Sequence, residues 1–341
     1  MKNMIVALDT AIQARPSVAG VNGVKIMAPE AARWDHLTGV ANNGNGDDNF
    51  NQLFRPSSAN YVGNPVAMKP WMVAGHTYFT HGNDIQARTY RENVAAQANS
   101  YGNVADNDYQ PIQIQSTEWC ALGNGEGFPN IETYFDVGLF MAKLAYIDIT
   151  VANAAFFSFW TALDMERGGY ARYSLIGYTP GASIYSLESY KDYPITSPGA
   201  IKTQPTLWAL GNYSLFVRPG FRRIKLSGDI GDQYMGVMAS AYKSPPGYRD
   251  SKGKELNRVV IVYVNMGTGT DAGCIAAAEF PNGTLPINIR CFETTMDNTS
   301  DAANNRNGLR SVNQTIRDEG GIYTIKPRSI LTVVYDFKVT P

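Results

Sequence analysis

The first 170 residues alternate between strand-like and helix-like segments. Short apolar runs that end on polar or aromatic residues occur at 23–30, 70–78, 109–119 and 154–166, and helical periodicity marks residues 4–15, 85–102 and 131–149. Strands that alternate with helices form parallel sheets, and nearly continuous apolar strands are covered on both faces. Four such strands in the order helix, then repeated strand and helix, favour one half of a (β/α)8 TIM barrel.

The pattern changes after residue 200. A helix-like segment at 206–220 precedes several short strand-like runs separated by turn residues, which is typical of a β-sandwich. We therefore predict an α/β domain, the C-terminal half of a TIM barrel, at residues 1–218 and an all-β sandwich at residues 219–341. With 341 residues, of which 44% are hydrophobic, the chain can form a core in each domain.

Charge and hydropathy exclude several partners. The 29 basic and 30 acidic residues are mixed along the chain and give a net charge of −1, so no basic run predicts a nucleic-acid partner. No apolar run reaches the roughly 18 residues of a membrane span, and the N-terminus lacks a signal-peptide pattern. The low charged fraction of 17% and the abundant Asn, Gly, Ser, Thr and Tyr are common in carbohydrate-active proteins, so we expect a secreted or periplasmic parent protein.

Cysteine and histidine patterns predict neither a metal nor a cofactor. Cys274 and Cys291 lie in consecutive strand-like segments, where they could pair or remain two buried thiols. Cys120 has no histidine placed nearby in the sequence to activate it as a nucleophile. The three histidines lack the spacing of metal ligands, and the glycine-rich stretch at 123–127 lacks the lysine of a phosphate-binding loop.

Polar and aromatic residues gather at the predicted strand ends, where barrel enzymes place their chemistry. Glycoside hydrolysis needs carboxyl groups beside the glycosidic bond, and it also needs aromatic rings on which a sugar face can stack. Glu118 is the leading carboxylate, although it could instead be a strand-end acid in a salt bridge. The strand ends also carry Glu30, His76, Trp119, Cys120 and Asp164, and the candidate sugar-stacking rings are Trp34, Tyr78, Trp119 and Trp160.

These residues resemble glycoside hydrolase family 30, which includes glucosylceramidases, β-1,6-galactanases and glucuronoxylanases. The stretch "STEWCALG" is similar to the family's seventh-strand segment, which implies that Glu118 is the nucleophile and that Cys120 matches a cysteine of the glucosylceramidase branch. "GHTY" implies that His76 and Tyr78 line the sugar subsite, and "FSFWTALD" implies that Trp160 is a stacking ring. "QPTLWALGNYSLFVRPGFRRI" is similar to the helix that leads from the family's barrel into its β-sandwich.

The same resemblance implies that part of the catalytic machinery is missing. The family's general acid/base is a Glu at the end of the fourth barrel strand, and residues 4–15 resemble the helix that follows it. We therefore expect the acid/base upstream of Met1, in a longer parent protein. A half-barrel would also leave two unpaired strand edges. Possible substitutes within the chain are Glu30, Asp35, Asp164 and Glu166.

The sequence thus predicts a retaining glycoside hydrolase that acts on β-linked glycans or glycosides, with a carbohydrate as its partner. Loss of general acid/base help typically costs about 10² to 10⁴-fold in rate, so we expect this chain alone to be weakly active or inactive. One alternative is a non-catalytic carbohydrate-binding remnant that keeps the aromatic pocket. Another is a structural module whose sandwich mediates interactions.

Overall fold

The computed structural model divides into two compact units, Met1–Pro129 with Ile147–Trp160 and Asn130–Tyr146 with Thr161–Pro341. The residues that the structure describes are 1–15, 17, 24–39, 48–63, 66, 69–121, 134–165, 174–179, 200–227, 236–268, 274–296, 308–312 and 322–339.

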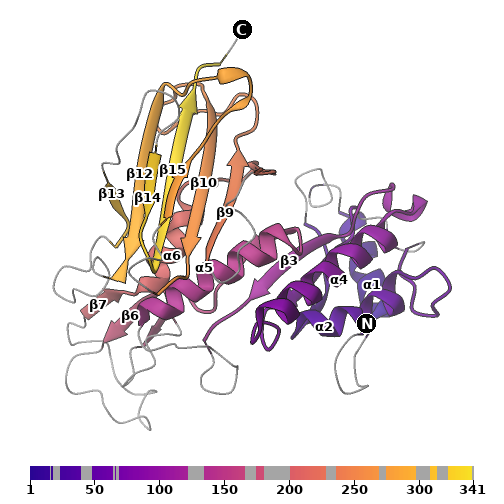
Figure 1. Cartoon of the computed structure of the whole chain (residues 1–341). Helices are drawn as coiled ribbons and strands as arrows, with labels where there is room; N and C mark the ends of the chain where they lie inside the picture. The colour runs from indigo at the N-terminus through magenta and orange to yellow at the C-terminus, as the bar shows by residue number, and fades with distance from the viewer. Residues whose placement is uncertain are drawn as a thin grey trace. The chain divides into compact units, whose positions relative to one another are not determined.

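The first unit, of which Figure 1 labels β3, is built on a four-stranded parallel sheet in the order β1-β2-β3-β4. Its strands are β1 (Met27–Ala31), β2 (Met72–His76), β3 (Gln113–Glu118) and β4 (Ala154–Phe157). The predicted parallel α/β arrangement is therefore confirmed for this region. The helices are α1 (Lys2–Gln13), α2 (Trp34–Thr38), α3 (Asn49–Phe54), α4 (Asp84–Gly102), the short 3-10 helix η1 (Ala105–Asn107) and the end of α5 (Tyr134–Thr150).

Side-chain caps and a glycine set several of these helix boundaries. The Asn83 side chain accepts a hydrogen bond from the Gln86 amide at 3.1 Å at the start of α4, and Asp48 caps α3 in the same way. Helix α2 ends at Gly39, whose φ of +71° suits a residue without a side chain. The sequence patterns did not predict α2 or α3, because both helices are shorter than two turns and leave little periodicity.

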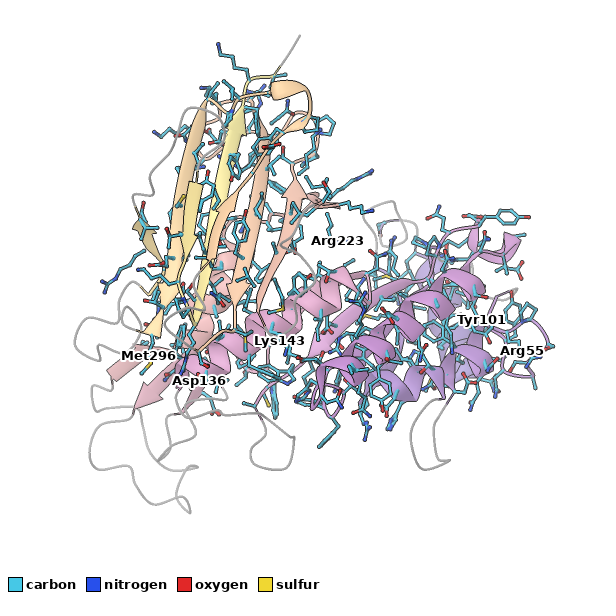
Figure 2. All side chains as sticks on the ribbon, viewed as in Figure 1. Arg55, Tyr101, Asp136, Lys143, Arg223 and Met296 are labelled. Atoms are coloured by element: carbon cyan, nitrogen blue, oxygen red, sulfur yellow. The ribbon has the colours of Figure 1, made fainter. Side chains whose placement is uncertain are left out.

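Helices α2, α3 and α4 contact one another, and α2 and α4 also contact the strands, which encloses the core of this unit. Tyr101 of α4, labelled in Figure 2, stacks on Phe50 of α3 with ring centroids 6.1 Å apart. Trp34 lies fully buried in the same core. A Cβ on Gly75 would come within 2.9 Å of the Trp34 ring, so the bare backbone of β2 leaves room for the indole. Trp34, predicted to line the sugar site, is therefore a core residue.

The second unit contains a six-stranded antiparallel sheet in the order β13-β12-β15-β10-β9-β8 (Figure 1). In addition, β11 pairs with β14, and β5, β6 and β7 form a separate three-stranded sheet. The strands are β5 (Leu163–Met165), β6 (Ile176–Thr179), β7 (Ala200–Thr203), β8 (Arg222–Ile224), β9 (Val237–Lys243), β10 (Asn257–Asn265), β11 (Cys274–Ala277), β12 (Asn288–Thr295), β13 (Arg310–Val312), β14 (Ile322–Ile325) and β15 (Ser329–Phe337).

Helix α6 (Pro205–Ser214) packs on β12 and β15. The Asn212 side chain donates to the Thr294 hydroxyl at 2.9 Å and accepts from the Thr332 hydroxyl at 2.9 Å. Because of these contacts, α6 groups with the antiparallel strands, whereas the boundary predicted at 218/219 separates it from them. The predicted strand at 154–166 is likewise two strands, β4 and β5, which lie in different sheets.

Cys291 is a free, buried thiol, so the possible pairing with Cys274 is not formed. Cys291 lies on β12 of the six-stranded sheet, whereas β11, which carries Cys274, pairs with β14. Burial raises the pKa of the Cys291 thiol to about 12. Among the helices of the described ranges, none is both long and apolar enough to cross a bilayer.

Candidate active site

Four polar side chains meet at the carboxyl ends of β1, β2 and β3. His76 Nε2 lies 2.8 Å from Glu30 Oε1 and 3.9 Å from Glu118 Oε2. The Tyr78 hydroxyl donates to Glu118 Oε1 at 2.9 Å. Adjacent parallel strands end at the same edge of a sheet, so residues distant in sequence become neighbours. Three predicted site residues, His76, Tyr78 and Glu118, are thus brought together.

A bulge sets the direction of Glu118. Gly75 pairs with Ser116, but the next residue of β2, His76, pairs with Glu118, so Thr117 is the extra residue on β3. Paired residues on neighbouring strands point to the same face, so the bulge places Glu118 on the face of His76. The Thr117 hydroxyl donates to Glu30 Oε1, which also lies next to His76.

The two oxygens of Glu118 have different surroundings. One accepts the Tyr78 hydrogen bond, and the other faces the His76 ring at 3.9 Å. The side chain is 34% exposed, so solvent reaches the carboxylate. Burial, and then the neighbouring Cys120 and Glu118, raise the pKa of Tyr78 well above its ordinary value. The phenol therefore remains a hydrogen-bond donor at neutral pH.

A buried ion pair lies behind this edge of the sheet. Asp148 of α5 accepts hydrogen bonds from the hydroxyls of Thr77 and Ser116, both at 2.7 Å, and pairs with Arg91 of α4. Arg91 also donates to the Thr80 carbonyl at 2.9 Å. The network connects β3 to the loop that carries Tyr78. Sequence reasoning missed it, because Arg91 and Asp148 are 57 residues apart and follow no local pattern.

The predicted aromatic and thiol residues divide into exposed and enclosed groups. Trp160 is 55% exposed just beyond β4, whereas Trp119 and Cys120 are fully buried. Trp119 packs against Phe159 with centroids 5.8 Å apart, and Cys120 Sγ lies 3.5 Å from the Tyr78 hydroxyl oxygen. Trp119 and Cys120 therefore pack in the protein interior next to the site residues. Trp160 offers an accessible ring.

Of the other acids considered as proton donors, Asp35 and Asp164 lie within the described residues. Asp35 is fully buried and accepts two hydrogen bonds from Arg33, at 2.9 and 2.6 Å. Asp164 lies on β5 in the second unit, and Glu166 and the glycine-rich stretch at 123–127 lie outside the described residues. In the parts of the chain described here, no three His, Cys, Asp or Glu side chains are grouped so as to hold a metal ion.

Comparisons with known proteins identify the family and the fold. The family model "O-Glycosyl hydrolase family 30" matches residues 1–170. A conserved exported protein from Bacteroides fragilis has a similar fold, with a TM-score of 0.69 and 22% identity over 98% of this chain and 59% of that one.

Two family 30 enzymes have the same fold at lower similarity. They are an endoxylanase from Clostridium papyrosolvens, with a TM-score of 0.54 and 14% identity, and a subfamily 8 xylanase from Clostridium acetobutylicum, with a TM-score of 0.54 and 16% identity. Each alignment covers 98% of this chain but only 60% and 59% of the respective enzyme. From the family match and the shared fold, the chain is a relative of glycoside hydrolase family 30.

Proposed function

We propose that this chain carries the nucleophile of a retaining glycoside hydrolase that acts on β-linked glycans or glycosides, and that Glu118 is this nucleophile. The observation that carries the proposal is the half-open Glu118 carboxylate, with one oxygen fixed by the Tyr78 hydroxyl and the other beside His76. The family relationship supports a glycosidase with a carbohydrate substrate.

The chemistry requires Glu118 to attack the anomeric carbon of the sugar. The bond to the leaving oxygen breaks as an ester to Glu118 forms, and water later cleaves that ester. Tyr78 holds Glu118 Oε1 at 2.9 Å, which leaves Oε2 available for the attack. The ionised carboxylate is the nucleophilic form of the acid.

We further propose that the proton donor for the leaving oxygen comes from polypeptide outside this chain. Within the first unit, Glu30 is engaged by His76 and Thr117, and Asp35 is engaged by Arg33. Among the described strands, β1 and β4 are at the two edges of this sheet, and Met27 and Phe156 expose apolar surface there. Unpaired, apolar strand edges of this kind are surfaces on which further strands add.

Activated fluoro-glycosides test whether Glu118 is the nucleophile, because their reaction needs no proton donor. A dinitrophenolate leaving group departs without protonation, and the fluorine slows hydrolysis of the ester that remains. We expect fluoro-glycosides of the β-xylo, β-gluco or β-galacto series to add one sugar to the chain. Peptide mass spectrometry should locate that sugar on Glu118.

The variants Glu118→Gln and Glu30→Gln provide the matched comparison. We expect that Glu118→Gln is not labelled and that Glu30→Gln is labelled like the wild type. A label on Glu30, or on any other residue, would show that the nucleophile is assigned wrongly. Glycan binding without any labelling would favour a carbohydrate-binding remnant instead.

A further inference from the structure

Phe79 is an exposed aromatic residue immediately beyond β2, next to Tyr78. It is 48% exposed, and its φ of +57° lies in the left-handed region that bulky residues rarely adopt. A glycine would adopt this backbone conformation without strain. Strained residues of this kind cluster at functional sites, so the use of phenylalanine here calls for a reason beyond packing.

A partly buried ion pair holds the Arg33 guanidinium over this ring. The Arg33 guanidinium lies 5.5 Å from the centroid of Phe79, and the same guanidinium is bound by the fully buried Asp35. Because Asp35 fixes Arg33, Arg33 in turn restricts the ring of Phe79. Asp35 also neutralises the charge of Arg33. The result is a positioned, half-exposed aromatic surface.

Trp160 is a second exposed ring at the same edge of the sheet. It is 55% exposed, and its backbone N–H donates to the Trp119 carbonyl at 2.9 Å. Strand β3 lies between β2 and β4 in the parallel sheet. Glu118, at the end of β3, is therefore flanked by Phe79 beyond one neighbouring strand and Trp160 beyond the other.

We propose that Phe79 stacks on the sugar ring next to the one that Glu118 attacks, so that the substrate is a glycan contacting the protein with at least two consecutive rings. This inference rests on the proposed function. The apolar face of a pyranose covers an aromatic ring, while its hydroxyls remain in water. Two separate rings, one on each side of the carboxylate, can each stack on one sugar. A substrate with a single sugar and a small leaving group would leave one of these rings without a partner.

The test is the dependence of binding on glycan length, measured by NMR titration of the full chain. The probes are xylose, xylobiose and xylotriose, and glucose, gentiobiose and gentiotriose. We expect Kd to fall about tenfold from mono- to disaccharide in at least one series, because burial of about 60 Å² of apolar surface has that effect. Phe79→Ala should remove this step and leave the monosaccharide Kd unchanged, whereas Phe79→Trp should keep it.

Tyr109→Ala is a matched control. Tyr109 is also an exposed aromatic residue, at 68%, with a φ of +55°, but it precedes β3 and so lies toward the opposite edge of the sheet. Equal affinity for mono- and disaccharides in the wild type, or an unchanged step in Phe79→Ala, would overturn the inference. The fall in Kd from mono- to disaccharide should persist in Glu118→Gln. A wrong nucleophile assignment and a wrong assignment of Phe79 therefore give different results.

Discussion

Two carboxylates, Glu118 of the parallel sheet and Asp336 of the antiparallel sheet, show how surroundings decide what an acid can do. Asp336 accepts from Arg258 at 2.7 and 3.2 Å and from Arg290 at 3.2 Å, and its side chain is only 7% exposed. Glu118 is held by a neutral phenol and approached by one histidine ring. Two guanidiniums neutralise Asp336 and occupy its oxygens. Glu118 keeps an accessible oxygen.

The two sheets produce this difference through their strand directions. In the antiparallel sheet, Arg258 of β10 lies directly opposite Asp336 of β15, so the two charges pair across strands. In the parallel sheet, β1, β2 and β3 bring their polar residues to a common edge. A cluster beside solvent can bind a ligand, but a cross-strand ion pair is already occupied.

Replacement of each acid by its amide should give the largest contrast. Glu118→Gln should reduce labelling by activated fluoro-glycosides at least about 10³-fold, because the covalent nucleophile is lost. Asp336→Asn should leave labelling unchanged but lower the free energy of unfolding by about 3 kcal/mol, because Arg258 would lose its buried partner. Labelling kinetics and thermal unfolding measure the two effects. Loss of labelling in Asp336→Asn at a temperature where it is folded would contradict the comparison.

Local patterns predicted the parts of the first unit that they can determine. Apolar runs located β1 to β4, and helical periodicity located α1, α4 and α5. The positions of His76, Tyr78 and Glu118 at strand ends then followed from the rule that parallel strands end at one edge. Each of these inferences needs only residues that are close in sequence.

The remaining features depend on contacts between distant segments. Trp34 of α2 is buried because Gly75, on the distant strand β2, leaves space for its ring. The bulge at Thr117 depends on the pairing of β2 with β3, which no composition pattern encodes. The exposure of Phe79 next to Arg33 likewise requires β1 and β2 to be neighbours.

Two buried threonines offer a smaller contrast between the units. Thr77 donates to Asp148 behind the candidate active site, and Thr332 donates to Asn212 against α6. Each change to valine removes a buried hydroxyl and should lower the free energy of unfolding by about 1 kcal/mol. Only Thr77→Val should also slow labelling of Glu118, about tenfold, because Thr77 precedes Tyr78 and small displacements of reacting groups are costly.

Thr77→Ser should restore the labelling rate, because serine keeps the hydroxyl that reaches Asp148. Labelling kinetics are measured at a temperature where all variants are folded. A change in rate then reports the position of the reacting groups and not the stability of the fold. Equal rates for Thr77→Val and the wild type would show that the Asp148 network only stabilises the fold. A slowed rate in Thr332→Val would show that the effect is not specific to the parallel sheet.

The last contrast is an alkaline loss of stability that belongs to the antiparallel unit. Burial raises the pKa of Cys291 from 9.0 to about 12. A group whose pKa is higher in the folded state stabilises the fold fully below its unfolded pKa, and this contribution falls as the pH rises toward 12. Cys291→Ala removes the titrating thiol.

Between about pH 9.5 and 11.5, stability of Cys291→Ala should fall less steeply than that of the wild type, by about 1.4 kcal/mol per pH unit. Urea unfolding at several pH values measures the slope, and Tyr109→Phe, a change at an exposed tyrosine, serves as the control. Labelling of Glu118 should be the same in Cys291→Ala and the wild type at neutral pH, because Cys291 lies in the unit without the candidate site. Equal slopes would mean that the thiol is accessible to water in the folded protein, and the burial of β12 would then need revision.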